Sequence, residues 1–159
     1  ALENVMVGAH LHLDGSLFKA LLRTPGLRRR EHALREEAAA LMAFVGLESY
    51  VRSRADSMPY GALKRLEIAR ALAMKPRLLF LDEPAAGLNP TETREADALV
   101  RRIAETGVTV VLVEHDMKMV MNLSDRILVL DYGKRLAEGS GPEVRGNPDV
   151  IAAYLGGHA

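Results

Sequence analysis

The stretch "LLFLDEPAAGLNP" (Leu78–Pro90) starts as a run of apolar residues and continues into two adjacent acids and a turn-forming segment. A short apolar run bounded by turn signals is typical of a buried strand. Asp82 and Glu83 then stand at the carboxyl end of that strand, which is where open α/β sheets bind their ligands. This stretch predicts an α/β fold with acidic side chains at one strand tip.

Strand and helix patterns alternate through the second half of the chain. Apolar runs at 108–114 and 126–130 predict two more strands, and a Tyr-Gly turn leads from the latter into a fourth. Helices are predicted at 31–47, 61–74, 91–105, 116–123 and 147–156. We expect Thr91 to be the N-cap of the helix 91–105, and Pro25-Gly26 to form a turn. Because the strands are continuous apolar runs, they predict a parallel sheet covered on both faces.

The composition is that of an ordinary globular protein. The 159 residues are 48% apolar and 26% charged, with no net charge and no cysteine. Disulfides and thiolate chemistry are therefore excluded, and the charge balance argues against a nucleic-acid partner. The apolar runs are far shorter than the ~20 residues that span a bilayer. Four histidines are expected to be surface or packing residues: His10, His12, His32 and His158.

A second predicted strand also ends in charged residues, Glu114-His115-Asp116. At a strand tip the Asp82 carboxylate can hold Mg²⁺ directly or through water, because this ion prefers oxygen ligands and keeps several waters. Glu83 points to the other side of the chain and can activate a water as a general base. His115 can donate a hydrogen bond to a phosphate oxygen. The combination indicates nucleotide hydrolysis.

Four segments together resemble the ATP-binding-cassette (ABC) ATPases. "LLFLDEP" resembles their Walker B strand, "AGLNP" the D-loop, "VLVEHD" the switch strand, and "SMPYGALKRLEIARAL" the signature loop with its helix. More narrowly, "MPYG", "DEPAAGLNP", "EHDM" and "NPDVIAAYLG" resemble the ATP-binding subunits of branched-chain amino acid importers. The resemblance covers essentially the whole chain. It implies an α/β fold of the P-loop NTPase type, with a partial parallel sheet, helices on both faces and a small helical lobe.

The resemblance implies a role for each matching residue. Asp82 would reach Mg²⁺ through water, Glu83 would polarise the attacking water, and His115 would contact the γ-phosphate of ATP. In this family the D-loop and the signature loop also bind nucleotide, the latter the ATP held by a second ATPase subunit, as a helix N-terminus suits anions. The D-loop residues would be Gly87, Leu88 and Asn89, and the signature loop would be Met58, Pro59, Tyr60, Gly61 and Ala62.

Partners and location also follow from the resemblance. The protein would bind membrane permease subunits through its helical lobe, and a second ATPase subunit that is identical or different. It would lie as a peripheral protein at the cytoplasmic face of the plasma (inner) membrane and couple ATP hydrolysis to the import of branched-chain amino acids. Two alternatives stay open: a non-catalytic interaction fragment of such an ATPase, and an ABC ATPase outside transport.

This sequence departs from the family pattern in two places. The signature loop retains only Gly61 of the common Leu-Ser-Gly-Gly-Gln, and Pro59 offers neither a hydroxyl nor a backbone N–H. In addition, no G-x-x-x-x-G-K-[ST] phosphate cradle occurs, and the segment with the metal-binding Gln is missing as well. We therefore expect the chain to begin just beyond that cradle, and to be inactive as an ATPase by itself.

The expected organisation has three parts: a helical lobe at 1–76, a catalytic α/β portion at 77–140 and a helical tail at 141–159. In this family the strand that carries the phosphate cradle lies between the strands 109–114 and 126–130. Its position should be left as a slot with unpaired edges, which invite pairing with another chain. We expect the chain either to aggregate or to close this slot. The core-facing residues beside the slot would be Val110, Leu112, Ile127 and Val129.

Overall fold

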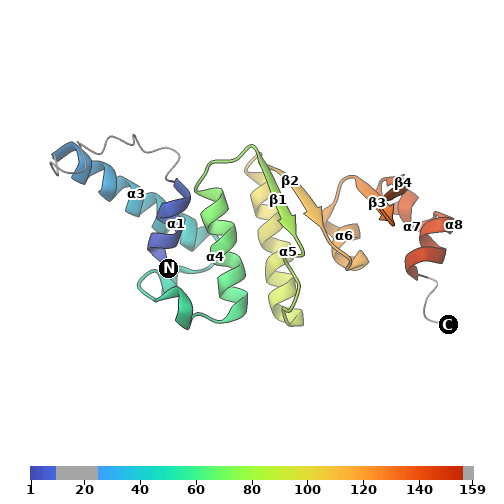
Figure 1. The fold of residues 1–159 in the computed structure, drawn as a ribbon, viewed down its shortest axis with the longest axis horizontal. Helices are drawn as coiled ribbons and strands as arrows, with labels where there is room; N and C mark the ends of the chain where they lie inside the picture. Colours follow the sequence, from blue (N-terminus) through green and yellow to red (C-terminus); the bar gives the residue numbers. More distant parts are fainter. Residues whose placement is uncertain (10–24, 156–159) are drawn as a thin grey trace.

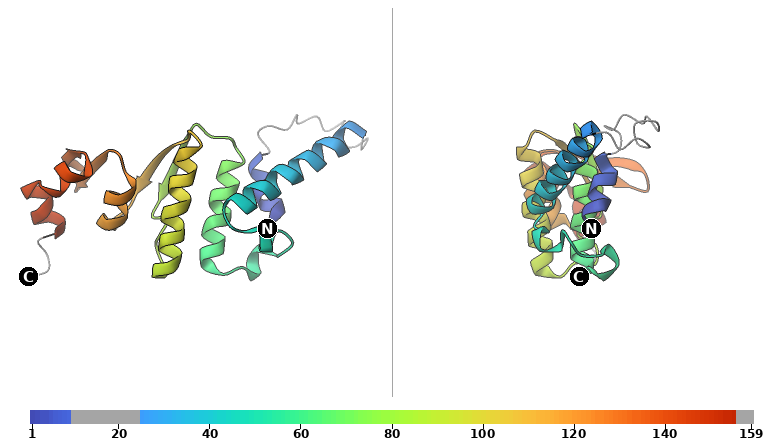
Figure 2. Two further views of the ribbon diagram at one scale, coloured as in Figure 1. Left: turned by 180° about the vertical axis from the view of Figure 1, so that it is seen from behind. Right: turned by 90° about the vertical axis from the view of Figure 1, so that its left-hand side faces the viewer.

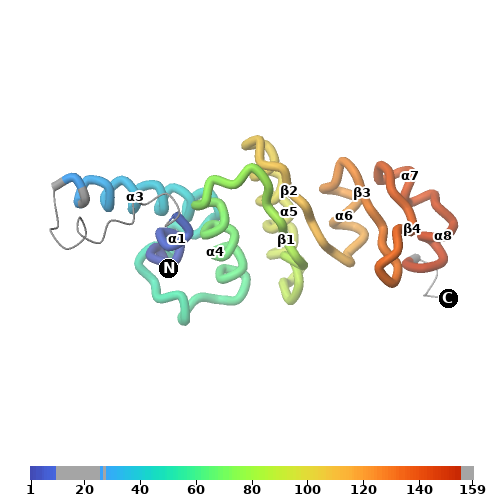
Figure 3. The backbone as a smooth tube through the Cα atoms, turned by 45° about the horizontal axis from the view of Figure 1, so that its top comes forward, coloured from blue at the N-terminus to red at the C-terminus, as the bar shows by residue number. Residues whose placement is uncertain are grey.

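The computed structural model describes residues 1–9 and 25–155, which are arranged in an elongated row of elements (Figure 1). Three helices form one end: α1 (Leu2–Gly8), α3 (Pro25–Phe44) and α4 (Tyr60–Leu72). Figure 3 shows α1 lying against both α3 and α4. Short 3₁₀ turns at Glu48–Tyr50 and Ala55–Ser57 connect α3 to α4.

The helix α3 begins earlier than expected. Pro25 and Gly26 are its first residues rather than a separate turn. Pro is well suited to the first helical position, where its missing N–H leaves no hydrogen bond unmade. Met42 and Val45, near the C-terminal end of this helix, are buried against the other helices.

Two parallel strands follow, β1 (Leu78–Asp82) and β2 (Thr109–Val113), with Leu78 opposite Thr109 and Asp82 opposite Val113. Between them runs α5 (Pro90–Glu105). Its N-cap is Asn89, so the expectation for Thr91 is wrong. The Asn89 Oδ1 accepts the N–H of Thr91 at 2.9 Å, and the Glu92 carboxylate accepts the N–H of Asn89 at 3.0 Å. This reciprocal capping box satisfies two backbone donors at once.

The other end of the molecule is built around an antiparallel pair, β3 (Ile127–Asp131) and β4 (Lys134–Gly139). The connecting residues Tyr132 and Gly133 both have positive φ, as a tight two-residue hairpin turn requires. Helices α6 (Met117–Leu123), α7 (Gly141–Arg145) and α8 (Pro148–Val150) flank this hairpin, and a π-helical turn, Ile151–Leu155, continues α8.

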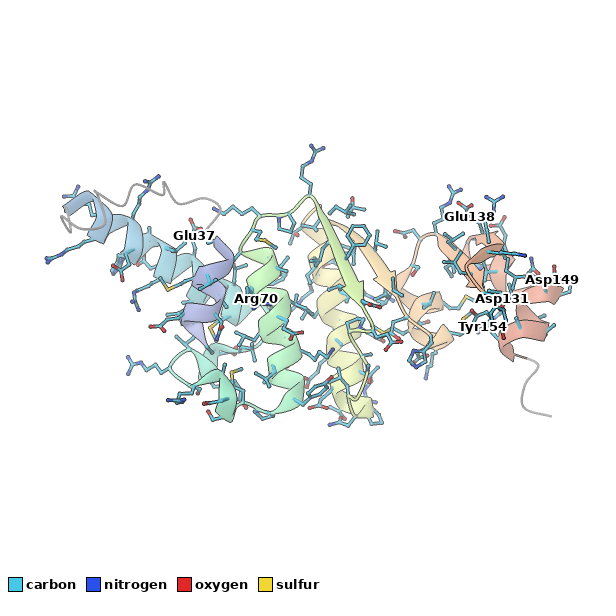
Figure 4. All side chains as sticks on the ribbon, in the orientation of Figure 1. Glu37, Arg70, Asp131, Glu138, Asp149 and Tyr154 are labelled. Carbon is cyan, nitrogen blue, oxygen red and sulfur yellow. The ribbon has the colours of Figure 1, made fainter. Side chains whose placement is uncertain are left out.

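Polar contacts fasten this C-terminal end. The Glu138 carboxylate accepts hydrogen bonds from Arg126 and Arg135, both at 2.9 Å. The Tyr154 hydroxyl donates to the Leu130 carbonyl at 2.5 Å, and Figure 4 shows Tyr154 close to Asp131, the last residue of β3. The tail after α8 is therefore tied back to the hairpin.

The sheet faces are covered on one side only within the described residues, where coverage of both was expected. Leu79 and Leu81 are buried, whereas Leu78, Phe80, Val111 and Val113 are exposed, Phe80 to 66%. In Figure 1, α5 lies behind β1 and β2. In the left view of Figure 2, which is seen from behind, α5 lies in front of these strands. Sequence alternation cannot reveal this, because the exposed positions are as apolar as the buried ones.

The slot expected between β2 and β3 is not closed. The strands form two separate two-stranded sheets, β1–β2 and β3–β4, and no ladder joins them. Ile127 and Val129 are buried as expected, and Val110 and Leu112 are partly buried. The division of the chain at residues 76 and 140 stays a prediction. Among the described helices, none is long and apolar enough to cross a membrane.

Candidate active site

The site residues singled out from the sequence lie at the carboxyl ends of β1 and β2 and at the first turns of α4 and α5. The carboxyl ends of β1 and β2 lie side by side there because the two strands are parallel and in register. The helices that precede and follow β1 run the opposite way, so the first turns of α4 and α5 reach the same edge. The carboxyl ends of β1 and β2 and the N-terminal ends of α4 and α5 therefore lie at the same edge.

Glu83 and His115 face each other across the two strand tips. The distance from His115 Nδ1 to Glu83 Oε1 is 3.3 Å, and both side chains are more than half exposed. Glu83 has a φ of +44°, a left-handed conformation that is uncommon for residues other than glycine. Its N–H donates to the Val113 carbonyl at 2.9 Å, which continues the ladder by one residue. Strained backbone of this kind clusters at functional sites.

Asp82 ends β1 on the same face as Phe80 and is exposed. A groove between α4 and β1 reaches it, lined in part by Lys64, Ile68 and Pro84. No group of three or more His, Cys, Asp or Glu in the described part of the chain is arranged to hold a metal ion.

The signature loop is divided between core and surface. The side chains of Met58 and Ala62 are buried in the core and Gly61 is buried as well, whereas Tyr60 is 53% exposed. Of the five signature-loop residues that were expected to bind nucleotide, two thus have side chains buried in the core. Pro59 is exposed just before α4, as its N-cap.

Tyr60 also connects the signature loop to the D-loop of the same chain. A Cβ placed on Gly87 would lie 3.1 Å from Tyr60 Cε1, so the Tyr60 ring packs directly on the backbone of Gly87. Gly87 has a φ of +76°, a backbone conformation that residues other than glycine rarely adopt. Leu88 is partly buried, and Asn89 is occupied in capping α5.

A second contact lies beside the first. A Cβ on Gly61 would lie 2.6 Å from Glu92 Oε1, so a side chain at this position would displace the capping carboxylate of α5. One turn further along, Arg65 pairs with Glu95 at 2.9 Å. The first turns of α4 and α5 are therefore held together by steric fit and by charge.

Sequence reasoning missed the role of Glu114. Its side chain is only 2% exposed, although its neighbour His115 is 72% exposed. Glu114 Oε1 accepts the N–H of Ala85 at 3.1 Å, and Oε2 accepts the N–H of His115 at 3.2 Å. The charged run at 114–116 was the available signal, but it did not say which of its members turns inward.

A further acid, Asp97 on α5, lies in the same neighbourhood. Its Oδ1 is buried without a hydrogen-bond partner. Burial raises the pKa of this carboxyl, and the negative charges of Asp116 and Glu114 raise it further, against the opposing charges of Arg101 and Lys118.

Of the expected surface histidines, His32 is exposed, and its Nδ1 lies 3.5 Å from Oε2 of Glu36. His10, His12 and His158 lie outside the described residues.

The fold matches that of solved ABC ATPases. An ATP-binding cassette of an ABC transporter, MJ1267, in its ADP conformation superposes with a TM-score of 0.77 at 28% identity, covering 98% of this chain and 62% of that one. The cbiO1 subunit from Clostridium perfringens, part of the ABC transporter complex cbiONQ, gives a TM-score of 0.68 at 30% identity, with 77% and 49% covered. These likenesses define the class as the ABC-type P-loop NTPases.

Sequence comparisons narrow the class. The model of the ABC transporter family matches residues 9–86, and that of the branched-chain amino acid ATP-binding cassette transporters matches residues 134–159. The high-affinity branched-chain amino acid transport ATP-binding protein BraF of Pseudomonas aeruginosa is 47% identical over 157 residues, and LivG of Escherichia coli is 46% identical over 156. The chain belongs to the ABC transporter ATPase family and is homologous to these proteins.

The alignments cover nearly all of this chain but only part of each relative. Each alignment covers 98% of this chain but 62% of BraF and 61% of LivG. The chain thus spans about three fifths of the length of these relatives.

Proposed function

We propose that this chain supplies the metal-holding and water-activating part of an ATPase that drives the import of branched-chain amino acids. The observation that carries the proposal is the meeting of Glu83 and His115 at 3.3 Å, beside the exposed carboxylate of Asp82. Homology to BraF and LivG supports the substrate class. The partners would be membrane permease subunits and a second ATPase subunit, identical or different, at the cytoplasmic face of the membrane.

The residues present fit a Mg²⁺ ion that is held jointly by a protein carboxylate and by the phosphates of ATP. Mg²⁺ in nucleotide sites is usually held by one or two carboxylates together with phosphates and waters. A single exposed carboxylate at a strand tip, Asp82, matches that demand. When bound, the ion would polarise phosphate oxygens and neutralise negative charge.

The chain's own groups then act on water and on phosphate. Glu83, exposed and held by its unusual backbone, orients a water and accepts its proton. His115 Nδ1 lies within reach of Glu83, and the exposed ring is free to donate a hydrogen bond to a transferring phosphoryl group. The carboxylate thus acts on the attacking water, and the imidazole acts on the phosphoryl group that the water attacks.

The signature loop would present a backbone surface to the nucleotide of the second subunit. Because Met58 and Ala62 are buried, contact falls to the exposed Pro59 and Tyr60 and to the backbone N–H groups that open α4. Such helix N-termini attract phosphate. The D-loop, packed on Tyr60, would lie at the same subunit boundary.

The test uses a chimera that joins this chain to the part of BraF that it does not match. In this chimera Glu83→Gln should lower kcat by about 100- to 10,000-fold, because Gln keeps the shape and loses the base. Binding of ATP, measured by calorimetry, should persist. His115→Ala should also lower kcat strongly, and Glu105→Gln, exposed on the last turn of α5, should leave it unchanged. Full turnover by Glu83→Gln would refute the proposed function.

A further inference from the structure

Glu114 is a buried acid between two exposed neighbours. At the end of β2, Val113 and His115 are exposed, whereas the Glu114 side chain is 2% exposed. Burying a carboxylate is costly unless hydrogen bonds replace its water. Glu114 therefore needs partners, and the structure gives it two backbone N–H groups.

One of these two hydrogen bonds crosses between the two strand tips, and the other is local to the end of β2. One carboxylate oxygen accepts the N–H of Ala85, two residues after Glu83, at 3.1 Å. The other accepts the N–H of His115 at 3.2 Å. A single side chain thereby ties the segment that follows β1 to the backbone that carries the imidazole.

The same contact acts on the strained backbone of Glu83. On one side, the N–H of Glu83 is held by the Val113 carbonyl at 2.9 Å. On the other, the segment is held at Ala85 by Glu114. A left-handed residue other than glycine persists only where its surroundings hold it in place. Removing the Glu114 carboxylate would release one of these two attachments.

We propose that Glu114 is a positioning residue, whose buried carboxylate fixes Ala85 and His115 so that Glu83 and His115 face each other. Its catalytic consequence rests on the proposed function, but the geometry does not. Glu114 would touch neither nucleotide nor water, because its side chain is buried beneath the segment that carries Glu83.

The first experiment measures amide hydrogen exchange in this chain and needs no activity. In Glu114→Ala the amide of Ala85 should exchange about tenfold faster or more, since hydrogen bonds to charged groups are the stronger kind. Glu114→Gln keeps an acceptor oxygen and should stay within about threefold of the parent. The matched control is Glu105→Ala, which changes an exposed acid on α5.

Either variant alone can decide this first experiment. If Glu114→Ala does not fold, the exchange rate in Glu114→Gln still gives the answer. Protection of Ala85 that is retained there supports the proposal, and protection lost overturns it. Protection that survives in a folded Glu114→Ala also overturns it.

The second experiment measures steady-state hydrolysis in the chimera with BraF. Glu114→Ala should lower kcat at least tenfold while the KM for ATP changes less than about twofold, because Glu83 and His115, which act on the water and on the transferring phosphoryl group, are misplaced while the contacts to the rest of the nucleotide are kept. Glu114→Gln should restore most of kcat. An unchanged kcat in Glu114→Ala, with Glu83→Gln inactive, would overturn this inference alone. Activity in Glu83→Gln would overturn the proposed function and leave the exchange result standing.

Discussion

The two ends of the molecule are built on cores of very different size. Eighteen of the described residues form one buried apolar cluster across α1, α3, α4, β1 and α5. Only four, Ile127, Val129, Val144 and Val150, form the cluster beneath the β3–β4 hairpin. Both ends have well-formed turns and helix caps. Local signals can therefore specify an element fully while the burial that stabilises it stays small.

The largest expected effect falls on the larger cluster. Ile103 on α5 is fully buried, and Ile103→Ala should lower the free energy of unfolding by about 2–5 kcal/mol, through lost burial and a residual cavity. Urea denaturation followed by circular dichroism measures this. The control Val7→Ala, at an exposed apolar position, should change it by less than about 0.5 kcal/mol. Equal losses in both variants would mean that the cluster does not determine stability.

A smaller effect is expected at the C-terminal end, and it should be local. Val144→Ala removes two buried methyl groups, worth about 1–2.5 kcal/mol. Amides of β3 and β4 should then exchange about tenfold faster or more, while those of α4 and α5 stay unchanged, because the two ends have separate apolar clusters. Leu128→Ala, exposed on the same hairpin, is the control. Uniform acceleration over the whole chain would show that the two ends unfold as one unit.

The smallest effect concerns Asp97, whose pKa is raised chiefly by burial and then by the charge of Asp116. A raised pKa in the folded state means that the ionised carboxyl destabilises the fold, and that this loss is relieved as pH falls through the raised value. Asp97→Asn should therefore raise the free energy of unfolding at pH 7, by less than either core substitution changes it. The gain should vanish near pH 4, about the pKa of an unfolded Asp. Denaturation at both pH values tests this, with exposed Asp125→Asn as the control; a gain that is equal at both would contradict it.

Much of the fold was predictable because its signals are local. The strands, the Tyr-Gly hairpin turn and the helices α4 and α5 lie within a few residues of where the sequence put them. The Glu83–His115 pair was predictable as well, since the carboxyl ends of parallel neighbours share an edge. Even the Asn89 cap could have been recognised, because Asn-Pro-Thr-Glu has the spacing of a capping box.

The rest depends on which face is covered and by what. From the sequence Glu114 is expected to be a surface acid, because Glu is almost never fully buried unless paired, and one of its two partners is the backbone N–H of Ala85 in a distant segment. Likewise, nothing in the sequence separates buried Leu79 from exposed Phe80, since both are apolar. Burial is a property of the assembled chain, and it becomes visible only when the elements are placed.

The close fit between α4 and α5 has a consequence for how this sequence can change over time. The Glu92 carboxylate leaves no room for a Cβ at Gly61, and it also caps the backbone at Asn89. A substitution such as Gly61→Ala would be tolerated only if Glu92 became shorter or moved, and α5 would then lose part of its cap. Positions 61, 89 and 92 should therefore vary together among homologous chains. A change in the signature loop at position 61 should be accompanied by changes at the start of α5.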